Sequence, residues 1–208
     1  MCGIFGAWLP QPLEKDHVKK FMAATHKLAH RGPDEHGAYT ERENGLFLGH
    51  QRLSIIDLSK SASQPMSSDG VVIAFNGEIY NFVELREELE ATGHKFQTKS
   101  DTEVLLKAFC CWGNDAFRRF DGMFSVAIRH PGGLTLATDS FGEKPLFVVS
   151  NASGIYFSSE PTPLIELLKL EFSPTNIEVA EFLNFGFMLS GRTGFLGLQA
   201  VTPATVMT

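Results

Sequence analysis

Apolar positions along the chain recur at two spacings, and these predict short strands and amphipathic helices in mixed order. Residues 2–8 form an apolar run that ends before Pro10, which predicts a buried strand. From residue 18 to residue 29, apolar side chains recur at helical spacing. We therefore expect a helix there that ends before Gly32-Pro33.

Turn sequences separate the strand-like runs that follow. Asn44-Gly45 lies within residues 39–47 and predicts a hairpin with a two-residue turn. Asp69-Gly70 marks a second turn before the apolar run 71–75. Two later hairpins are expected, with strands at 123–128 and 134–138 and at 146–149 and 155–157.

Helical periodicity returns between and after these strands. A helix is expected from Phe82 to a cap at Gly93, and the next opens with Ser100-Asp-Thr-Glu103, which has the form of a capping box. Further helical patterns cover a short segment around residues 117–120, then 164–170 and 177–183. Hairpins outnumber regular strand–helix alternation, which favours an α+β fold of antiparallel sheets covered by helices.

Composition narrows the class of partner. The 208 residues carry a net charge of −6, which argues against nucleic acid or an anionic membrane as a partner. No apolar run reaches the roughly 18 residues that span a bilayer. The N-terminus lacks the features of a signal peptide, and three cysteines make no disulfide framework. A cytoplasmic location is therefore expected.

Cys2 is the first candidate for chemistry. If Met1 is removed, the α-amine of Cys2 has a reference pKa of about 7.7–8.0 and can accept the thiol proton. One residue then supplies both nucleophile and base. The competing interpretation is a small buried cysteine at the start of a strand, and position alone favours it.

Six motifs in a fixed order favour the catalytic interpretation of Cys2 over the structural one. Together they resemble the glutaminase domain of class II glutamine amidotransferases, most closely the N-terminal half of asparagine synthetases. The resemblance covers residues 1–208 and implies a four-layer αββα N-terminal nucleophile hydrolase sandwich with two antiparallel sheets. The motifs are Met-Cys-Gly-Ile-Phe-Gly6, His30-Arg-Gly-Pro-Asp34, Arg52-Leu-Ser-Ile-Ile56, Asn76-Gly-Glu-Ile-Tyr-Asn81, Ser100-Asp-Thr-Glu103 and Phe141-Gly-Glu-Lys-Pro-Leu146.

The resemblance also implies a pocket for free glutamine. Arg52 would bind the α-carboxylate, since a guanidinium can hold two oxygens at once. Asp101 would bind the ammonium with help from Glu78 or nearby backbone carbonyls, although an acid in the first turn of a helix also has a purely local explanation. Taken alone, Arg52 reads as a solvated cation and Glu78 as a polar turn residue. Backbone groups of Leu53, Ser54, Ile55 and Ile56 would line the same wall.

Asn76 and Gly77 are the implied oxyanion hole. Donors on the Asn76 amide and the Gly77 backbone would meet the charge that develops when Cys2 attacks the side-chain amide. The alternative is an Asn-Gly hairpin turn, but residues after Ile79 read as a helix and supply no second strand. We expect His30 and His50 to be structural, and no metal site is predicted.

The resemblance assigns a partner as well. Ammonia would pass to an ATP-dependent synthetase domain or subunit, which is absent from these residues, so ATP and magnesium are expected there and no cofactor here. The chain is then a fragment or a split subunit that cannot make asparagine alone; a homodimer is one of the open oligomeric states. Thr138, Ser140 and Ala204 depart from the family pattern and weaken inference about the domain junction only.

Three alternatives stay open: the glutaminase half of another amidotransferase, an N-terminal cysteine amidohydrolase of different substrate, and a degenerate domain without activity.

Overall fold

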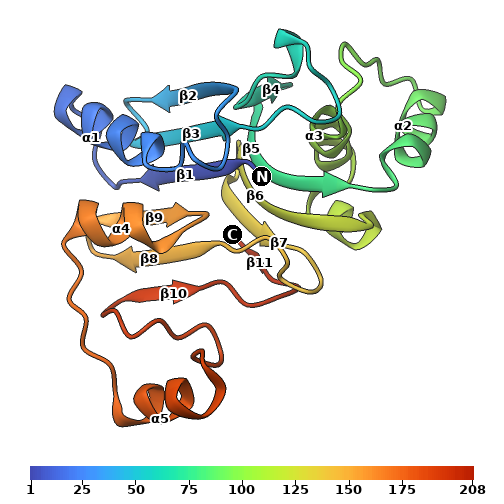
Figure 1. Ribbon diagram of the computed structural model, residues 1–208. Helices are drawn as coiled ribbons and strands as arrows, with labels where there is room; N and C mark the ends of the chain where they lie inside the picture. Colours follow the sequence, from blue (N-terminus) through green and yellow to red (C-terminus); the bar gives the residue numbers. More distant parts are fainter.

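Two antiparallel sheets are stacked face to face in the computed structural model, which describes residues 1–208 (Figure 1). The first sheet has the order β10-β8-β9-β1-β3-β2 and the second β11-β7-β6-β5-β4. The strands are β1 (Gly3–Trp8), β2 (Glu35–Glu41), β3 (Leu46–Arg52), β4 (Met66–Ser68), β5 (Val71–Ile79), β6 (Gly122–His130), β7 (Gly133–Thr138), β8 (Phe147–Asn151), β9 (Gly154–Ser158), β10 (Leu198–Ala200) and β11 (Val206–Met207).

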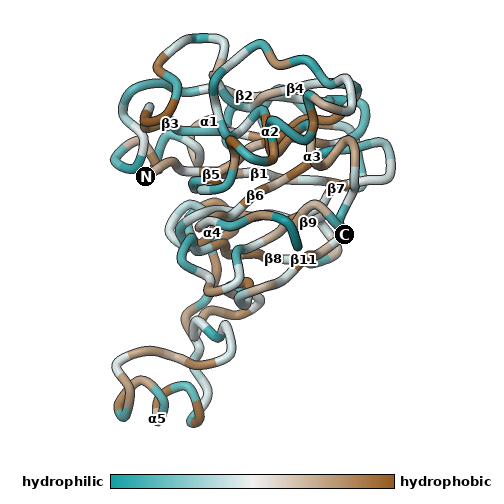
Figure 2. Tube along the Cα trace, turned by 90° about the vertical axis from the view of Figure 1, so that its right-hand side faces the viewer, coloured by the Kyte–Doolittle hydropathy of each residue, from teal (hydrophilic) through white to brown (hydrophobic).

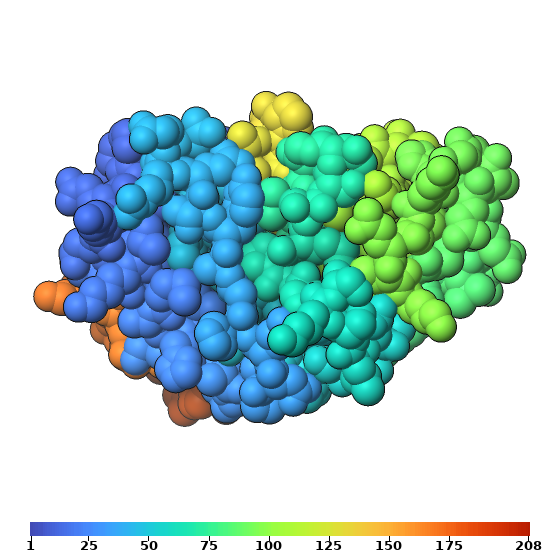
Figure 3. All heavy atoms as spheres, turned by 90° about the horizontal axis from the view of Figure 1, so that it is seen from above, coloured from blue at the N-terminus to red at the C-terminus, as the bar shows by residue number.

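Helices cover the outer face of each sheet. Because α1 and α4 pack on the first sheet and α2 and α3 cover the second, the layers run αββα (Figure 1). Seen from above, the N-terminal third in blue and the green α2 and α3 occupy opposite sides (Figure 3). The helices are α1 (Lys15–His26), α2 (Phe82–Ala91), α3 (Asp101–Trp112), α4 (Pro161–Leu168) and α5 (Asn176–Phe185), with short 3-10 helices η1 (Lys60–Ala62) and η2 (Gly113–Arg119).

Consecutive residues of the central strands are buried because each sheet is covered on both faces. In β5, Val72 and Ala74 pack between the two sheets, whereas Ile73 and Phe75 pack toward the helices of the second sheet. The strand therefore reads as a continuous apolar run without alternation. This arrangement confirms the predicted α+β sandwich.

The predicted two-residue turn at Asn44-Gly45 is wrong. Glu41 pairs with Leu46, so the β2–β3 loop has four residues. The N–H of Leu9 donates to the Gly45 carbonyl at 2.9 Å, which ties this loop to the segment after β1. Two-residue turns lie in other hairpins, among them Asp69-Gly70, where φ is 53° and 76°, the left-handed values of a type I′ turn.

The capping box at the start of α3 forms only in part. The Ser100 hydroxyl accepts from the Glu103 N–H at 3.2 Å, as predicted. The Glu103 carboxylate does not return to Ser100; it accepts from the N–H groups of Gln97 and Thr98 at 2.9 and 2.6 Å. The buried Glu103 carboxylate therefore satisfies two backbone N–H groups of the loop before α3 and ties this loop to the helix.

The C-terminal part of the chain holds what the periodicity missed. Strands β10 and β11 return to the two sheets and were not predicted, and the short helix expected near residues 117–120 is the 3-10 helix η2. Helix α5 lies away from the layered body, and brown apolar segments mark it in the hydropathy view (Figure 2). None of the helices has the length and apolar character needed to cross a membrane.

Candidate functional site

Cys2 is fixed directly before β1, between the neighbouring β3 and the loop that follows α1. Its Sγ lies 3.4 Å from the N–H of Leu53 and 3.6 Å from the Leu53 carbonyl. The Arg31 Nε–H donates to the Cys2 carbonyl at 2.9 Å, and Arg31 also pairs with Glu160 at 2.9 Å. Burial raises the pKa of the Cys2 thiol, so the thiol needs a base before it can attack. With Met1 attached, the Cys2 nitrogen is an amide and cannot be that base.

A pocket of about 80 Å³ opens beside the cysteine. It lies where β3 and β5 meet the N-terminus of α3, and parts of the chain that are distant in sequence build its walls. Nine of the ten predicted site residues line it: Cys2, Arg52, Leu53, Ile55, Ile56, Asn76, Gly77, Glu78 and Asp101.

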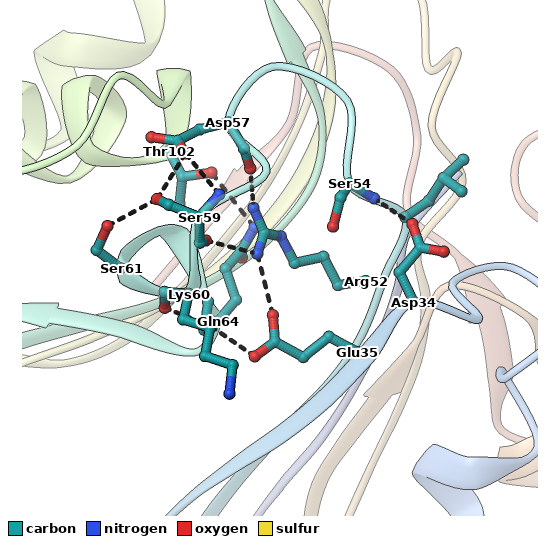
Figure 4. A network of polar contacts seen from close by, with 12 residues as sticks. Asp34, Glu35, Arg52, Ser54, Asp57, Ser59, Lys60, Ser61, Gln64 and Thr102 are labelled. Carbon is teal, nitrogen blue, oxygen red and sulfur yellow. Dashed lines mark hydrogen bonds and ion pairs between the residues drawn. The ribbon is translucent and has the colours of Figure 1, made fainter.

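Ser54 is the predicted site residue that the structure does not bring to this pocket. Its N–H donates to the Asp34 carboxylate at 2.8 Å, on the side of the chain away from the Arg52 guanidinium (Figure 4). The His30–Asp34 motif therefore supports the site from two ends, because Arg31 holds Cys2 and Asp34 holds the segment after β3.

Arg52 is held by a network of polar contacts at the end of β3 (Figure 4). Nη1 donates to the Glu35 carboxylate at 3.0 Å and to the Ser59 carbonyl at 3.2 Å, and Nη2 donates to the Asp57 carbonyl. A guanidinium has five N–H donors, so the Nε–H and one Nη2–H have no protein partner. These two donors lie on neighbouring nitrogens and can bind both oxygens of one carboxylate. The protein contacts thus orient the Arg52 guanidinium and leave two of its N–H donors for a ligand.

Asp101 begins α3 and is 5% exposed. Burial raises its pKa to about 6, although Oδ2 accepts the Ile79 N–H at 3.0 Å and the nearby backbone donors of α3 oppose the rise. The negative charge of Glu78 raises the pKa further. Both carboxylates line the pocket, so this end of it favours a cation.

Asn76 and Gly77 lie within β5, paired with Ser125 and Phe124 of β6, which excludes the hairpin-turn interpretation. The fully buried Asn76 amide has one weak contact, Nδ2 to the Ser125 hydroxyl at 3.4 Å, and its Oδ1 has no partner. A Cβ at position 77 would lie 2.1 Å from the Met123 carbonyl, so only glycine fits. An incompletely bonded amide next to an open backbone strand is what an oxyanion hole needs.

Comparison with known proteins shows the family of the chain. The family model described as "Glutamine amidotransferase domain" matches residues 1–208. The chain belongs to this family. It is 35% identical to asparagine synthetase [glutamine-hydrolyzing] 1 of Bacillus subtilis over its whole length, and this covers 33% of that protein. It is 32% identical to asparagine synthetase [glutamine-hydrolyzing] 2 of Oryza sativa, covering 94% of this chain and 32% of that one.

Solved structures agree on the fold of this amidotransferase domain. Glutamine phosphoribosylpyrophosphate amidotransferase from B. subtilis matches with a TM-score of 0.68 at 21% identity, covering 81% of this chain and 44% of that one. A structure titled as the allosteric regulatory enzyme of purine biosynthesis matches with a TM-score of 0.71 at 20% identity, covering 97% and 45%. The chain spans about a third of the length of the asparagine synthetases that it resembles.

Some pocket residues of the amidotransferase domain were not predicted from sequence. Gln64 joins two elements of the wall, since its Oε1 accepts from the Phe75 N–H at 2.7 Å and its Nε2 lies 3.3 Å from the Thr102 hydroxyl. Lys144 also lines the pocket. Lys144 belongs to a motif that carried the resemblance, so its sequence signal was present without a role attached.

His50 has the structural role expected of it. It is fully buried, and burial lowers its pKa to about 4, so the ring is neutral at physiological pH. Its Nε2 lies 3.0 Å from the Phe75 carbonyl, which links β3 in the first sheet to β5 in the second.

Proposed function

We propose that this domain hydrolyses L-glutamine to glutamate and ammonia, with Cys2 as nucleophile once Met1 is removed. The observation that carries the proposal is the convergence of Cys2, Arg52, Asn76 and Asp101 on one pocket. Free glutamine presents a carboxylate, an ammonium and a side-chain amide, and these residues offer a complementary group for each. An N-acyl amide would need no such pair of opposite charges, so the pocket favours the amino acid.

The reaction proceeds in two steps. The α-amine of Cys2 takes the thiol proton, and the thiolate forms an Sγ–C bond to the amide carbon of glutamine. The negative oxygen is met by the Asn76 amide and the Gly77 N–H. The C–N bond then breaks as the protonated amine gives its proton to the leaving nitrogen, which departs as ammonia. Water hydrolyses the thioester, releases glutamate and restores the thiol.

We further propose that the ammonia passes to an ATP-dependent synthetase domain of the asparagine synthetase type. The relatives with that name are about three times as long as this chain. ATP and magnesium would bind in that domain, and this one needs no cofactor. The apolar side chains exposed around α5 support a second domain or subunit at that face, since monomers seldom expose contiguous apolar surface of this kind.

Release of glutamate and ammonia from glutamine tests the proposal. The N-terminal mass is measured first, so that only chains without Met1 are assayed. Cys2→Ala should lower the rate of glutamine hydrolysis by at least about 10³-fold, because the nucleophile and its proton transfer are lost together. Cys110→Ser, which changes a half-buried cysteine outside the pocket, should retain activity. Full activity of Cys2→Ala would refute the mechanism.

A further inference from the structure

Lys144 is a buried cation without an anionic partner. Its residue is 7% exposed, and it lines the same pocket as Cys2. Nζ makes one hydrogen bond in the protein, to the Sδ of Met1 at 3.3 Å. A thioether is a weak acceptor, and burying an unpaired ammonium is unfavourable. A lysine kept in such a place needs an explanation beyond packing.

The backbone around Lys144 is held firmly. The Asp139 carboxylate accepts the N–H groups of Phe141, Glu143 and Lys144 at 2.9, 3.0 and 3.1 Å, and that of Phe124 in β6 at 3.0 Å. These bonds close the loop upon itself and tie it to the second sheet. The Lys144 side chain therefore starts from a fixed point, and its ammonium is directed to the N-terminus of the chain.

Removal of Met1 takes away the hydrogen bond of this ammonium. Five covalent bonds join the Met1 sulfur to the Cys2 nitrogen, so Nζ lies within roughly 10 Å of the amine that processing creates. At this distance in a partly buried site, a positive charge lowers the pKa of an amine by about one unit.

The other cations near the amine each have a carboxylate partner, which weakens their effect on it. Arg31, which contacts the Cys2 carbonyl, pairs with Glu160 at 2.9 Å, and Arg52 pairs with Glu35 at 3.0 Å. Lys144 is the only cation lining the pocket that has no carboxylate partner.

The anions that face the pocket come from other elements. They are Glu78 of β5 and Asp101 of α3, and both favour the protonated form of a nearby amine. Bound glutamine would cover Asp101 with its own ammonium. The ammonium of Lys144 has the opposite effect on the amine, and only Glu78 then opposes it.

We propose that the ammonium of Lys144 favours the neutral, proton-accepting form of the Cys2 α-amine and so sets the lower end of the pH range of the reaction. The inference rests on the proposed glutaminase function. Lys144 is thus a positioning residue that acts through the amine. It takes no part in the bonds that form or break.

The test compares pH profiles of kcat/KM for glutamine in chains without Met1. Lys144→Met keeps the length of the side chain and removes its charge, and Lys144→Gln is a second neutral variant. In both, the acid limb should move up by about one pH unit, because the amine holds its proton to higher pH. Lys144→Arg keeps the charge and should leave the limb in place. An unchanged limb in the neutral variants, or a rise in KM alone, would overturn the proposal.

A titration without turnover gives an independent readout. In Cys2→Ser chains labelled with ¹³C at residue 2, the chemical shift of its α-carbon reports protonation of the amine. The pKa of this amine should rise by about one unit when Lys144→Met is added. An equal pKa in the two folded proteins contradicts the inference. If the enzyme with Lys144 does not hydrolyse glutamine at all, the proposed function fails instead, so the two failures are distinguishable.

Discussion

Asp101 is held where its charge is poorly stabilised until a cation arrives. It begins α3, which favours an anion, but it is buried beside a second carboxylate, Glu78, and burial raises its pKa to about 6. A ligand ammonium would reverse this effect because it supplies the missing opposite charge. Glutamine binding should therefore strengthen as pH rises through about 6.

Asp101→Asn tests whether the buried charge of Asp101 destabilises the fold. The folded pKa of about 6 lies above the ordinary 3.8, so the folded state loses stability as pH rises through 6. The neutral variant avoids this loss, and its free energy of unfolding at pH 8 should exceed that of the parent by about 3 kcal/mol, with little difference at pH 4. Urea denaturation at the two pH values measures it, and KM for glutamine should rise at least tenfold.

Asp57→Asn is the control, because its effect on the free energy of unfolding at pH 8 should have the opposite sign. Hydrogen bonds from Ser59 and from the Lys99 N–H lower the pKa of the Asp57 carboxyl, so its charge stabilises the fold at pH 8 and this is lost in acid. The variant should be less stable than the parent at pH 8. Equal effects of the two substitutions would contradict the electrostatic explanation.

Strand β5 combines a packing role with a chemical one. Its apolar residues were enough to predict a strand, and the absence of a hairpin after Asn76-Gly77 was also read correctly from the helix that follows. The sequence predicted a backbone donor at Gly77 but did not explain why this residue is glycine. The structure shows that the β6 backbone approaches too closely for any side chain. Such contacts between strands 46 residues apart leave no local trace.

Gly77→Ala should therefore damage the sheet as well as the site. The new Cβ would lie 2.1 Å from the Met123 carbonyl, and relieving that clash should lower the free energy of unfolding by about 3 kcal/mol. Gly70→Ala is the matched control: it has a φ of 76° but nothing within 4 Å, so only the backbone strain of about 1 kcal/mol applies. Urea denaturation compares them; equal losses would show that conformation, and not contact, governs position 77.

At the scale of the whole molecule, the longest run of exposed large apolar residues lies around α5. The four layers bury their facing side chains in three clusters, but the segment around α5 extends from this body with large apolar residues exposed (Figures 1 and 2). These include Ile177, Phe182, Leu183, Phe185 and Phe187, each more than half exposed.

Substitution of two of these residues tests the role of that face. Phe182→Ser combined with Leu183→Ser should reduce the binding of a hydrophobic dye and the self-association of the isolated domain. Both side chains are exposed, at 55% and 78%, so glutamine hydrolysis and thermal stability should hardly change. Met22→Ser on α1 removes an isolated, partly exposed side chain and should have no effect on either property. Dye fluorescence and sedimentation measure the outcome; a large loss of stability would show that α5 packs on the body.

The sequence by itself determined most of the elements, the class of fold and most of the pocket residues, because periodicity, turn residues and ordered motifs are local properties of the chain. Only the tertiary structure decided how these residues are held. The partners of Arg52, the raised pKa of Asp101, the close approach at Gly77 and the unpaired ammonium of Lys144 all depend on groups distant in sequence. Burial and electrostatic coupling arise only when the layers meet, and no pattern along one strand or helix contains them.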